Sequence, residues 1–201
     1  MTVLAVWCAG LGAAAQFGKI SVLFDVLGDQ YAGYSAVALG LIVSIVGIVG
    51  LVFGTTAGLF VARIGPRRAI VAALLMGAVM SALQSLGLSY PAMIASRVVE
   101  GVSHLAIVVV GPTVIAGLAA ERFRGLAMTL WSSFFGVTYA ILALLAPPLM
   151  AAYGAGAVFV GHTIWMVAMG LCLALLLPHD TPAPVIARGG ILQQHLAIYA
   201  S

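Results

Sequence analysis

Charged residues are scarce in this sequence. Only 6% of its 201 residues are Asp, Glu, Lys or Arg, whereas 64% are hydrophobic and the mean hydropathy is +1.22. A water-soluble domain of this length needs a polar surface that so few charged residues cannot form. The scarcity therefore excludes soluble enzymes and nucleic-acid binders. Lipid is the remaining solvent, and the long, unalternating apolar runs favour membrane helices over barrel strands.

Cysteines and catalytic sequence patterns are also scarce. Cys8 and Cys172 both lie in apolar runs without CxxC or metal-ligand spacing, so we interpret them as small hydrophobic residues. The sequence has no HExxH, no GxSxG and no Asp pair, and its histidines lack the pairing within two helices that haem ligation needs. We predict no metal, no cofactor and no enzymatic activity. An intramembrane enzyme or redox protein is the least favoured alternative.

Six apolar runs are long enough to cross a bilayer core, which takes about 20 helical residues. They cover about 3–27, 36–62, 69–88, 92–119, 126–152 and 156–177. We therefore predict an all-α membrane protein with a six-helix bundle over residues 1–178. A polar cytoplasmic linker follows at 179–190, and residues 191–201 are apolar enough to begin a truncated seventh span.

Basic residues mark every second connection between these runs, namely Arg63, Arg67, Arg68, Arg122, Arg124 and Arg188. The other connections carry no Lys or Arg, and Asp25 and Asp29 lie near the first of them. By the positive-inside rule, the basic connections and the amino terminus face the cytoplasm. The short, charge-poor loops suit a bacterial inner membrane.

Several ionisable side chains fall inside the apolar runs, where such groups are costly and face protein or water instead of lipid. Arg97, Glu100 and His104 are spaced i, i+3 and i+7, which places them along one side of a helix. Lys19 lies roughly 12 Å of helix from the end of the first run, and Gln16 precedes it by one turn.

These positions suggest functional roles, each with a structural alternative. Lys19 and Gln16 are candidates for a solute-facing cavity, the alternative being a lysine that snorkels to the interface. Arg97 either lines the pathway or serves as an interfacial anchor or ion-pair partner. Glu100 and His104 are candidates for proton coupling, because a carboxyl balanced between desolvation and an arginine, or an imidazole, exchanges protons readily. His162 in the sixth run is interpreted as a hydrogen-bonded core histidine.

The second run contains glycines at helical spacing. Gly47, Gly50 and Gly54, followed by Gly58, give one smooth face. Such small-xxx-small patterns allow another helix backbone to approach closely. We predict helix packing on Gly47, Gly50 and Gly54.

The segment "GLFVARIGPRR", residues 58–68, resembles the loop signature of major facilitator superfamily (MFS) transporters, roughly G-x-L-a-D-r-x-G-r-r-r. Ala62 stands where the family has its acidic residue, so the charge contact made by that acid is absent. The resemblance implies a gating loop on the cytoplasmic side, formed by the matching residues Gly58, Arg63, Gly65, Arg67 and Arg68.

Two further segments are similar to the same family. Arg97, Glu100 and Gly101 match its fourth-span pattern R-x-x-q-G, and "ERFRG" from Glu121 resembles the start of its fifth helix. The antiporter pattern G-P-x-x-G-G is poorly represented by "APPLMA" at 146–151, which leaves the transport mode open.

The resemblance implies one half of a twelve-span transporter, built as two inverted three-helix repeats with substrate bound near the midplane between the halves. We therefore expect transport of a small polar or anionic solute by alternating access, coupled to protons. The expected substrate-binding residues are Lys19, Gln16 and Arg97, and the expected coupling residues are Glu100 and His104. The lipid bilayer, the solute and a missing carboxy-terminal half or second copy are the implied partners. A truncated, non-transporting scaffold half is the alternative.

Overall fold

The computed structural model describes residues 1–180, which contain helices and no strand. Within that part, six long apolar segments could cross a membrane: α1 (Thr2–Val22), α3 (Ala36–Ile64), α4 (Pro66–Gln84), α5 (Tyr90–Leu118), the segment Glu121–Tyr153, and α8 (Gly156–Leu176). The prediction of an all-α six-helix bundle is confirmed. Apart from His179 and Asp180, the predicted linker and seventh span lie outside the described residues.

Two of the predicted spans are divided into shorter helices. The first run continues past α1 as α2 (Phe24–Gln30). The fifth comprises α6 (Arg124–Ser132) and α7 (Phe134–Tyr153), and the short 3-10 helix η1 (Glu121–Phe123) precedes it. Ser133, at the α6–α7 break, donates a hydrogen bond to Leu130 O at 2.7 Å and accepts one from the Trp7 indole N–H at 3.2 Å. A hydroxyl bonded to a carbonyl of its own helix bends that helix.

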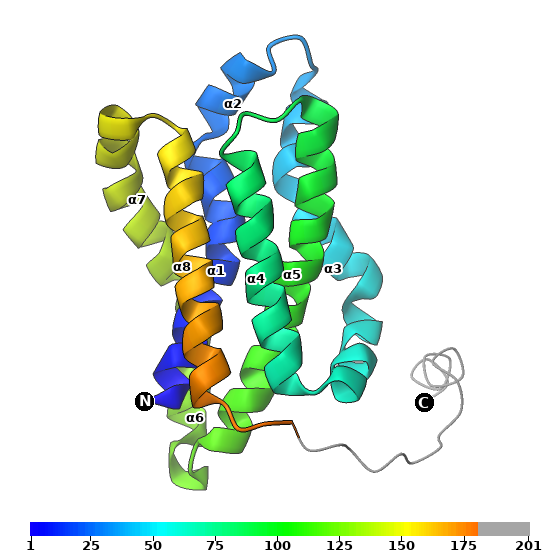
Figure 1. Ribbon diagram of the computed structural model, residues 1–201, viewed down its shortest axis with the longest axis vertical. Helices are drawn as coiled ribbons and strands as arrows, with labels where there is room; N and C mark the ends of the chain where they lie inside the picture. Colours follow the sequence, from blue (N-terminus) through cyan, green and yellow to red (C-terminus); the bar gives the residue numbers. More distant parts are fainter. Residues whose placement is uncertain (181–201) are drawn as a thin grey trace.

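The six spans form two inverted repeats, α1–α3–α4 and α5–α6/α7–α8. The packing contacts obey this symmetry: α3 packs on α5 as α7 packs on α1, α4 packs on α5 as α8 packs on α1, and α4 packs on α8. Because α1 and α5 start at opposite ends of the bundle (Figure 1), exchanging the two repeats also inverts them.

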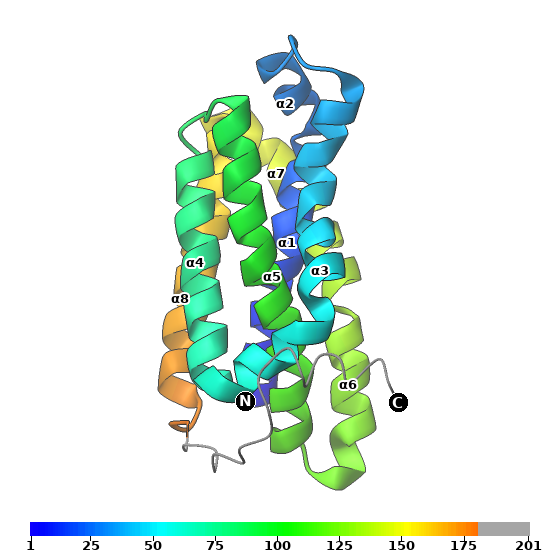
Figure 2. The ribbon, with the colours of Figure 1, turned by 90° about the vertical axis from the view of Figure 1, so that its right-hand side faces the viewer.

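Helix α1 is the most enclosed span, with α3 and α5 on one side and α7 and α8 on the other (Figures 1 and 2). Its buried residues are mostly small, which lets the neighbouring helices approach its backbone from several directions. The small buried residues are Ala9, Gly10, Gly12, Ala13, Ala14 and Gly18.

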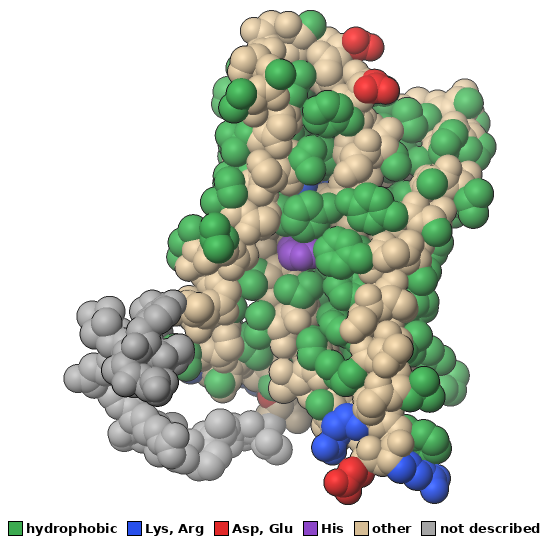
Figure 3. All heavy atoms as spheres, turned by 180° about the vertical axis from the view of Figure 1, so that it is seen from behind, with side chains coloured by type: hydrophobic (Ala, Val, Ile, Leu, Met, Phe, Trp, Pro, Cys, Tyr) green, Lys and Arg blue, Asp and Glu red, His purple; other side chains and the backbone are tan. Residues whose placement is uncertain are grey.

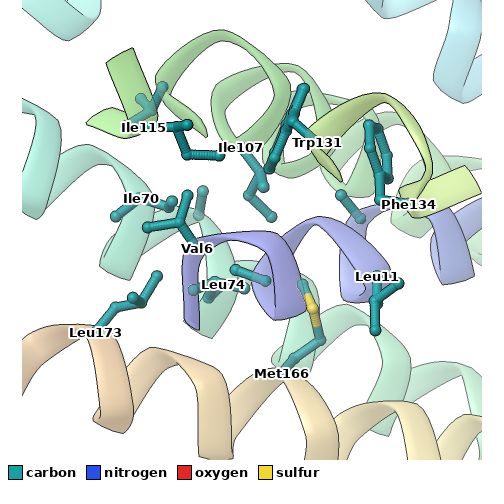
Figure 4. Close-up of a cluster of buried hydrophobic side chains, with 14 of the residues drawn as sticks. Val6, Leu11, Ile70, Leu74, Ile107, Ile115, Trp131, Phe134, Met166 and Leu173 are labelled. Atoms are coloured by element: carbon teal, nitrogen blue, oxygen red, sulfur yellow. The ribbon is translucent and has the colours of Figure 1, made fainter. Parts of the chain in front are cut away.

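Two apolar clusters stabilise the bundle, one toward each end. One contains Val6, Leu74, Ile107 and Met166 (Figure 4), and the other contains Ile20, Ile42, Met93 and Phe159. In α1, α5 and α8 alike, residues of the first cluster are separated along the helix from residues of the second. The interval between them holds the polar groups described below.

On the face shown in Figure 3, most charged side chains lie toward the two ends, with acidic side chains at one end and basic side chains together with acidic ones at the other. We call these the acidic end, which carries Asp25 and Asp29, and the basic end, which carries Arg63 and Arg122. Between the ends the surface is largely apolar, and side chains such as Leu51 in the middle of α3 are up to 83% exposed. Such a surface requires lipid contact, so the chain is an integral membrane protein.

The glycine face of α3 does not pack inside the described part of the bundle, so helix packing on Gly47, Gly50 and Gly54 stays a prediction whose partner helix is not among the described residues. A Cβ on Gly50 or Gly54 would meet no atom within 4 Å, and one on Gly47 would only touch Phe17. The close approach of α3 to α5 occurs instead at Gly101, where a Cβ would lie 2.9 Å from the Val49 side chain. The buried face of α3 presents branched side chains to α5, which turns the glycine face outward.

The two glycine environments give a paired prediction. Gly101→Ala should lower the free energy of unfolding by about 1–3 kcal/mol through overpacking against α3, reduced by the roughly 1 kcal/mol that alanine gains in a helix. Gly50→Ala should be neutral or stabilising. Unfolding in detergent, followed by circular dichroism or tryptophan fluorescence, measures both, and equal losses would contradict the packing described here.

Candidate functional site

A layer of polar side chains crosses the bundle between the two apolar clusters. Its members come from α1, α4, α5 and α8, and each is at most 6% exposed. We call it the polar layer, and it consists of Gln16, Lys19, Ser81, Gln84, Ser96, Arg97, Glu100, Ser103 and His162. Tertiary packing therefore brings together four of the five predicted substrate-binding and coupling residues.

Glu100 lies at the centre of the polar layer with no exposed surface. Its Oε1 accepts from Lys19 Nζ at 2.5 Å, and its Oε2 accepts from Arg97 Nη1 at 2.5 Å and from Gln84 Nε2 at 3.0 Å. All of these neighbours are donors, so the arrangement fits an ionised carboxylate. The Arg97–Glu100 ion pair is one of the two interpretations that the spacing left open.

Lys19 connects three helices to α1. In addition to its ion pair with Glu100 on α5, its Nζ donates to Ser81 Oγ on α4 at 2.9 Å and lies 3.2 Å from His162 Nδ1 on α8. The ring of Phe159 lies beside it, 5.3 Å from Nζ to the ring centroid. Its aliphatic stem is fully enclosed as well.

Arg97 connects α5 to α3 and α1 through backbone carbonyls. Its Nε donates to Ile42 O at 2.9 Å, and its Nη1 donates to Gln16 O at 2.6 Å in addition to Glu100. The planar guanidinium supplies these donors in fixed directions that an ammonium cannot reproduce. Arg97 therefore holds the two repeats together at the level of the polar layer.

The tautomer of His162 follows from its partners. His162 Nε2 lies 2.9 Å from Gly12 O, and since a carbonyl can only accept, Nε2 carries the ring proton. In the neutral imidazole, Nδ1 is then an acceptor facing Lys19 Nζ and Ser81 Oγ. The interpretation of His162 as a hydrogen-bonded core histidine is confirmed.

Three atoms of the layer have no hydrogen-bond partner in the described part of the chain: Gln16 Oε1, Gln84 Oε1 and Arg97 Nη2. Gln16 donates through Nε2 to Ser103 Oγ at 2.9 Å, and Gln84 Nε2 is shared between Glu100 and Ser96. The layer thus contains both acceptor and donor capacity for a small polar molecule such as water.

His104 lies apart from the ionic groups, on the partly exposed side of α5. Its Nδ1 is 3.0 Å from Ala13 O on α1, so this nitrogen carries the proton in the neutral ring. The rings of Phe17 and Phe135 contact it, with centroids 5.0 and 6.0 Å from that of the imidazole.

The burial of Lys19, Gln16 and Arg97 differs from the expected solute-facing positions. All three have no exposed surface, so Lys19 neither reaches the membrane interface nor faces an open cavity in this conformation. The reason is the number of acceptors inside the bundle. Carbonyls and side chains of α1, α3, α4 and α8 surround these cations and replace the water that a cavity would supply.

Ser81, Gln84 and Ser103 were missed by the sequence reasoning. Single hydroxyls and amides in an apolar run are common and often bond their own helix, so they give little signal. Helical spacing offers one indication for α4, because Ser81 and Gln84 are three residues apart and share a face. Nothing in the sequence relates that face to Glu100, which lies on another helix.

The loop motif lies at the basic end, where Gly65 ends α3 and begins α4 with a φ of +92°, a conformation that favours glycine. Asp180, just after α8, accepts from the backbone N–H groups of Arg67 and Arg68, both at 2.9 Å. A carboxylate at a helix amino terminus is stabilising. The loop therefore has an acidic partner supplied by Asp180, although Ala62 replaces the family's acid.

Two inverted three-helix repeats joined by a buried ionic layer define half of a carrier-type membrane protein. The family model described as Major Facilitator Superfamily matches residues 2–196, and the chain belongs to this family. It is 29% identical over 165 residues to the Inner membrane transport protein YajR of Escherichia coli (strain K12). That match covers 80% of this chain and 35% of the relative, so the chain spans about a third of the relative's length.

Proposed function

We propose that this chain forms one wall of a transporter that moves a small polar or anionic solute by alternating access, coupled to protons. The observation that carries the proposal is the sealed polar layer, in which Lys19 and Arg97 share the carboxylate of Glu100. Ionisable groups are costly inside a membrane and mark solute pathways and proton relays. Family membership and the transport relative support the same class of activity.

The anionic preference rests on the charge of the layer. Two cations face one carboxylate, which leaves one positive charge in a region of low dielectric. Its potential is weakly screened and extends to the neighbouring surface around His104, which packs on α1 through Ala13. A solute reaching that surface meets a positive potential without touching Lys19 or Arg97.

His104 is the proposed contact for the solute and one of two coupling groups. With Nδ1 bonded to Ala13 O, its Nε2 accepts a hydrogen bond when the ring is neutral and donates one when the ring is protonated. Protonation therefore changes which solute groups His104 can bind. Glu100, the second coupling group, is the fixed anion around which the cationic partners would rearrange.

The orientation follows the distribution of charge along the bundle axis. We place the basic end, with the amino terminus and the loop motif, in the cytoplasm and the acidic end outside, because positively charged loops stay on the cytoplasmic side. Asp180 and Gly65 then act together in the cytoplasmic gate. We infer a bacterial inner membrane from the relative and from the short loops.

The second wall of the pathway is assigned to a carboxy-terminal half or to a second copy of this chain. The glycine face of α3 suits such a partner, because a Cβ added at Gly50, Gly54 or Gly58 would meet no atom of another described helix within 4 Å. A backbone could approach this face closely.

Proteoliposomes that contain the purified chain and a trapped pH dye test the transport proposal. The probes are permanently charged alkyl sulfonates, with neutral diols and quaternary ammonium ions of similar size as comparisons. Sulfonate gradients should drive proton movement at least fivefold above empty vesicles, and the neutral and cationic probes should not. His104→Leu should raise the half-saturating sulfonate concentration at least tenfold, because the solute loses its polar contact.

Ser44→Ala is the matched control, since Ser44 is exposed on α3 and bonds only its own helix, at Gly40 O. Flux per protein that rises with the protein-to-lipid ratio supports a pathway formed by two copies. If wild-type chain moves neither sulfonate nor protons at any ratio, transport by this chain on its own is contradicted and the scaffold-half alternative is favoured.

A further inference from the structure

The hydrogen bonds of Lys19 define its protonation state in this conformation. Glu100 Oε1, Ser81 Oγ and His162 Nδ1 surround Nζ at 2.5, 2.9 and 3.2 Å. The carboxylate can only accept, Nδ1 accepts because Nε2 holds the ring proton, and Ser81 can direct its own proton to Phe159 O at 3.0 Å. Three acceptors match the three N–H bonds of an ammonium, so Lys19 is charged here.

The remaining groups of the layer are poor proton carriers. Arg97 keeps its charge under all ordinary conditions. A proton on Glu100 would lack an acceptor, because Lys19, Arg97 and Gln84 all donate to this carboxylate. The imidazole of His162 is fixed in one tautomer by Gly12 O.

The net charge of the polar layer also depends on the protonation of Lys19. Lys19 and Arg97 each contribute one positive charge and Glu100 one negative charge, so the sealed layer carries one excess proton. Around Lys19, α5 contributes Arg97, Glu100 and the more distant His104, α8 contributes His162, and α4 contributes only neutral polar groups. No described acid other than Glu100 faces the layer, and an excess charge buried in this way is costly.

We propose that Lys19 is the proton carrier of the polar layer, in addition to the titrating His104 outside it, and that the sealed conformation is the proton-loaded state of the layer. When the bundle opens, an N–H bond of the ammonium breaks, the electron pair stays on Nζ and the proton passes to an entering water molecule. The neutral Arg97–Glu100 pair remains. His162 also lines a cavity of about 230 Å³ between α1, α7 and α8, whose other walls are almost entirely apolar.

This inference rests on the proposed proton-coupled transport, but its first test needs no transport. Lys19 is the only lysine in the sequence, so protein grown with lysine labelled at ¹³Cε and ¹⁵Nζ gives one side-chain signal. In lipid nanodiscs the full chain should show that signal changing from ammonium to amine in a single step within pH 5–10. An ammonium signal that persists unchanged across this range would overturn the proposal.

Transport supplies the second test. Lys19→Met fixes a neutral side chain and Lys19→Arg a permanent charge, so sulfonate-driven proton flux should fall at least tenfold in both variants, whereas Ser44→Ala should match wild type. Proton-coupled flux that survives in Lys19→Met would refute the role of Lys19 while leaving the proposed function intact. A titrating Lys19 in a wild-type chain without flux would instead contradict the proposed function alone.

Discussion

Glu100→Gln is expected to destabilise the protein by about 3–5 kcal/mol, the cost of removing one partner from a buried ion pair. The reason is that the substitution leaves an unbalanced positive charge in a site closed to water. Wild type holds two cations and one carboxylate, and the substitution leaves Lys19 and Arg97 facing each other without an anion. The amide also presents donors to neighbours that are themselves donors.

Lys19→Met should be tolerated better, although it also removes a charged member of the same ion pair. The remaining Arg97 and Glu100 form a neutral pair, and methionine fills most of the volume of the lysine stem. The remaining cost, about 1–3 kcal/mol, is that Ser81 and His162 lose a donor. Denaturation in detergent compares the two variants, and a Lys19→Met protein as unstable as Glu100→Gln would contradict the charge count.

Arg97→Lys is expected to be the second most damaging substitution, with a loss of about 3 kcal/mol from two broken buried hydrogen bonds. The guanidinium donates to Ile42 O, Gln16 O and Glu100 Oε2, which lie on three helices. A lysine ammonium is a point charge on a flexible stem and cannot reach all three acceptors. Because the substitution keeps the positive charge, any loss of stability measures the contribution of the hydrogen bonds that only the guanidinium can form.

Arg63→Lys is the matched control for that prediction. Arg63 is exposed at the basic end, where a charge-conserving substitution should change stability by no more than about 0.5 kcal/mol. Thermal unfolding of both variants in the same detergent gives the comparison. Equal stability of Arg97→Lys and wild type would show that the two carbonyl contacts contribute nothing to folding.

The family and the six spans follow from local information. A membrane helix satisfies its own backbone hydrogen bonds, so length and hydropathy are sufficient to locate it. The turn at Gly65 and the basic residues around it depend on short segments, and their pattern carried the resemblance to the family. The breaks at Leu23 and Ser133 were not predicted. At the second, the Ser133 hydroxyl also accepts from Trp7, which is 126 residues away.

The site was predictable only in part. Charged residues in apolar runs identified Lys19, Arg97 and Glu100, since their cost in lipid demands a partner. Whether that partner would be water, solute or protein could not be read from one helix at a time. His162 and Ser81 complete the coordination of Lys19 from helices far away in the sequence.

The glycine pattern of α3 illustrates the same limit. Its spacing shows that one face is smooth, but not which neighbour covers that face. In the described residues the opposite side of α3 packs on Gly101 of α5.

By itself, the amino-acid sequence determined that this protein is helical, lies in lipid and belongs to a family of carriers, because hydropathy, helix length and short motifs are properties of contiguous residues. Only the tertiary structure decided that the cations point inward and share one carboxylate between repeats. That outcome depends on acceptors on α1, α3, α4 and α8, and their positions around Lys19 and Arg97 exist only once the bundle has packed.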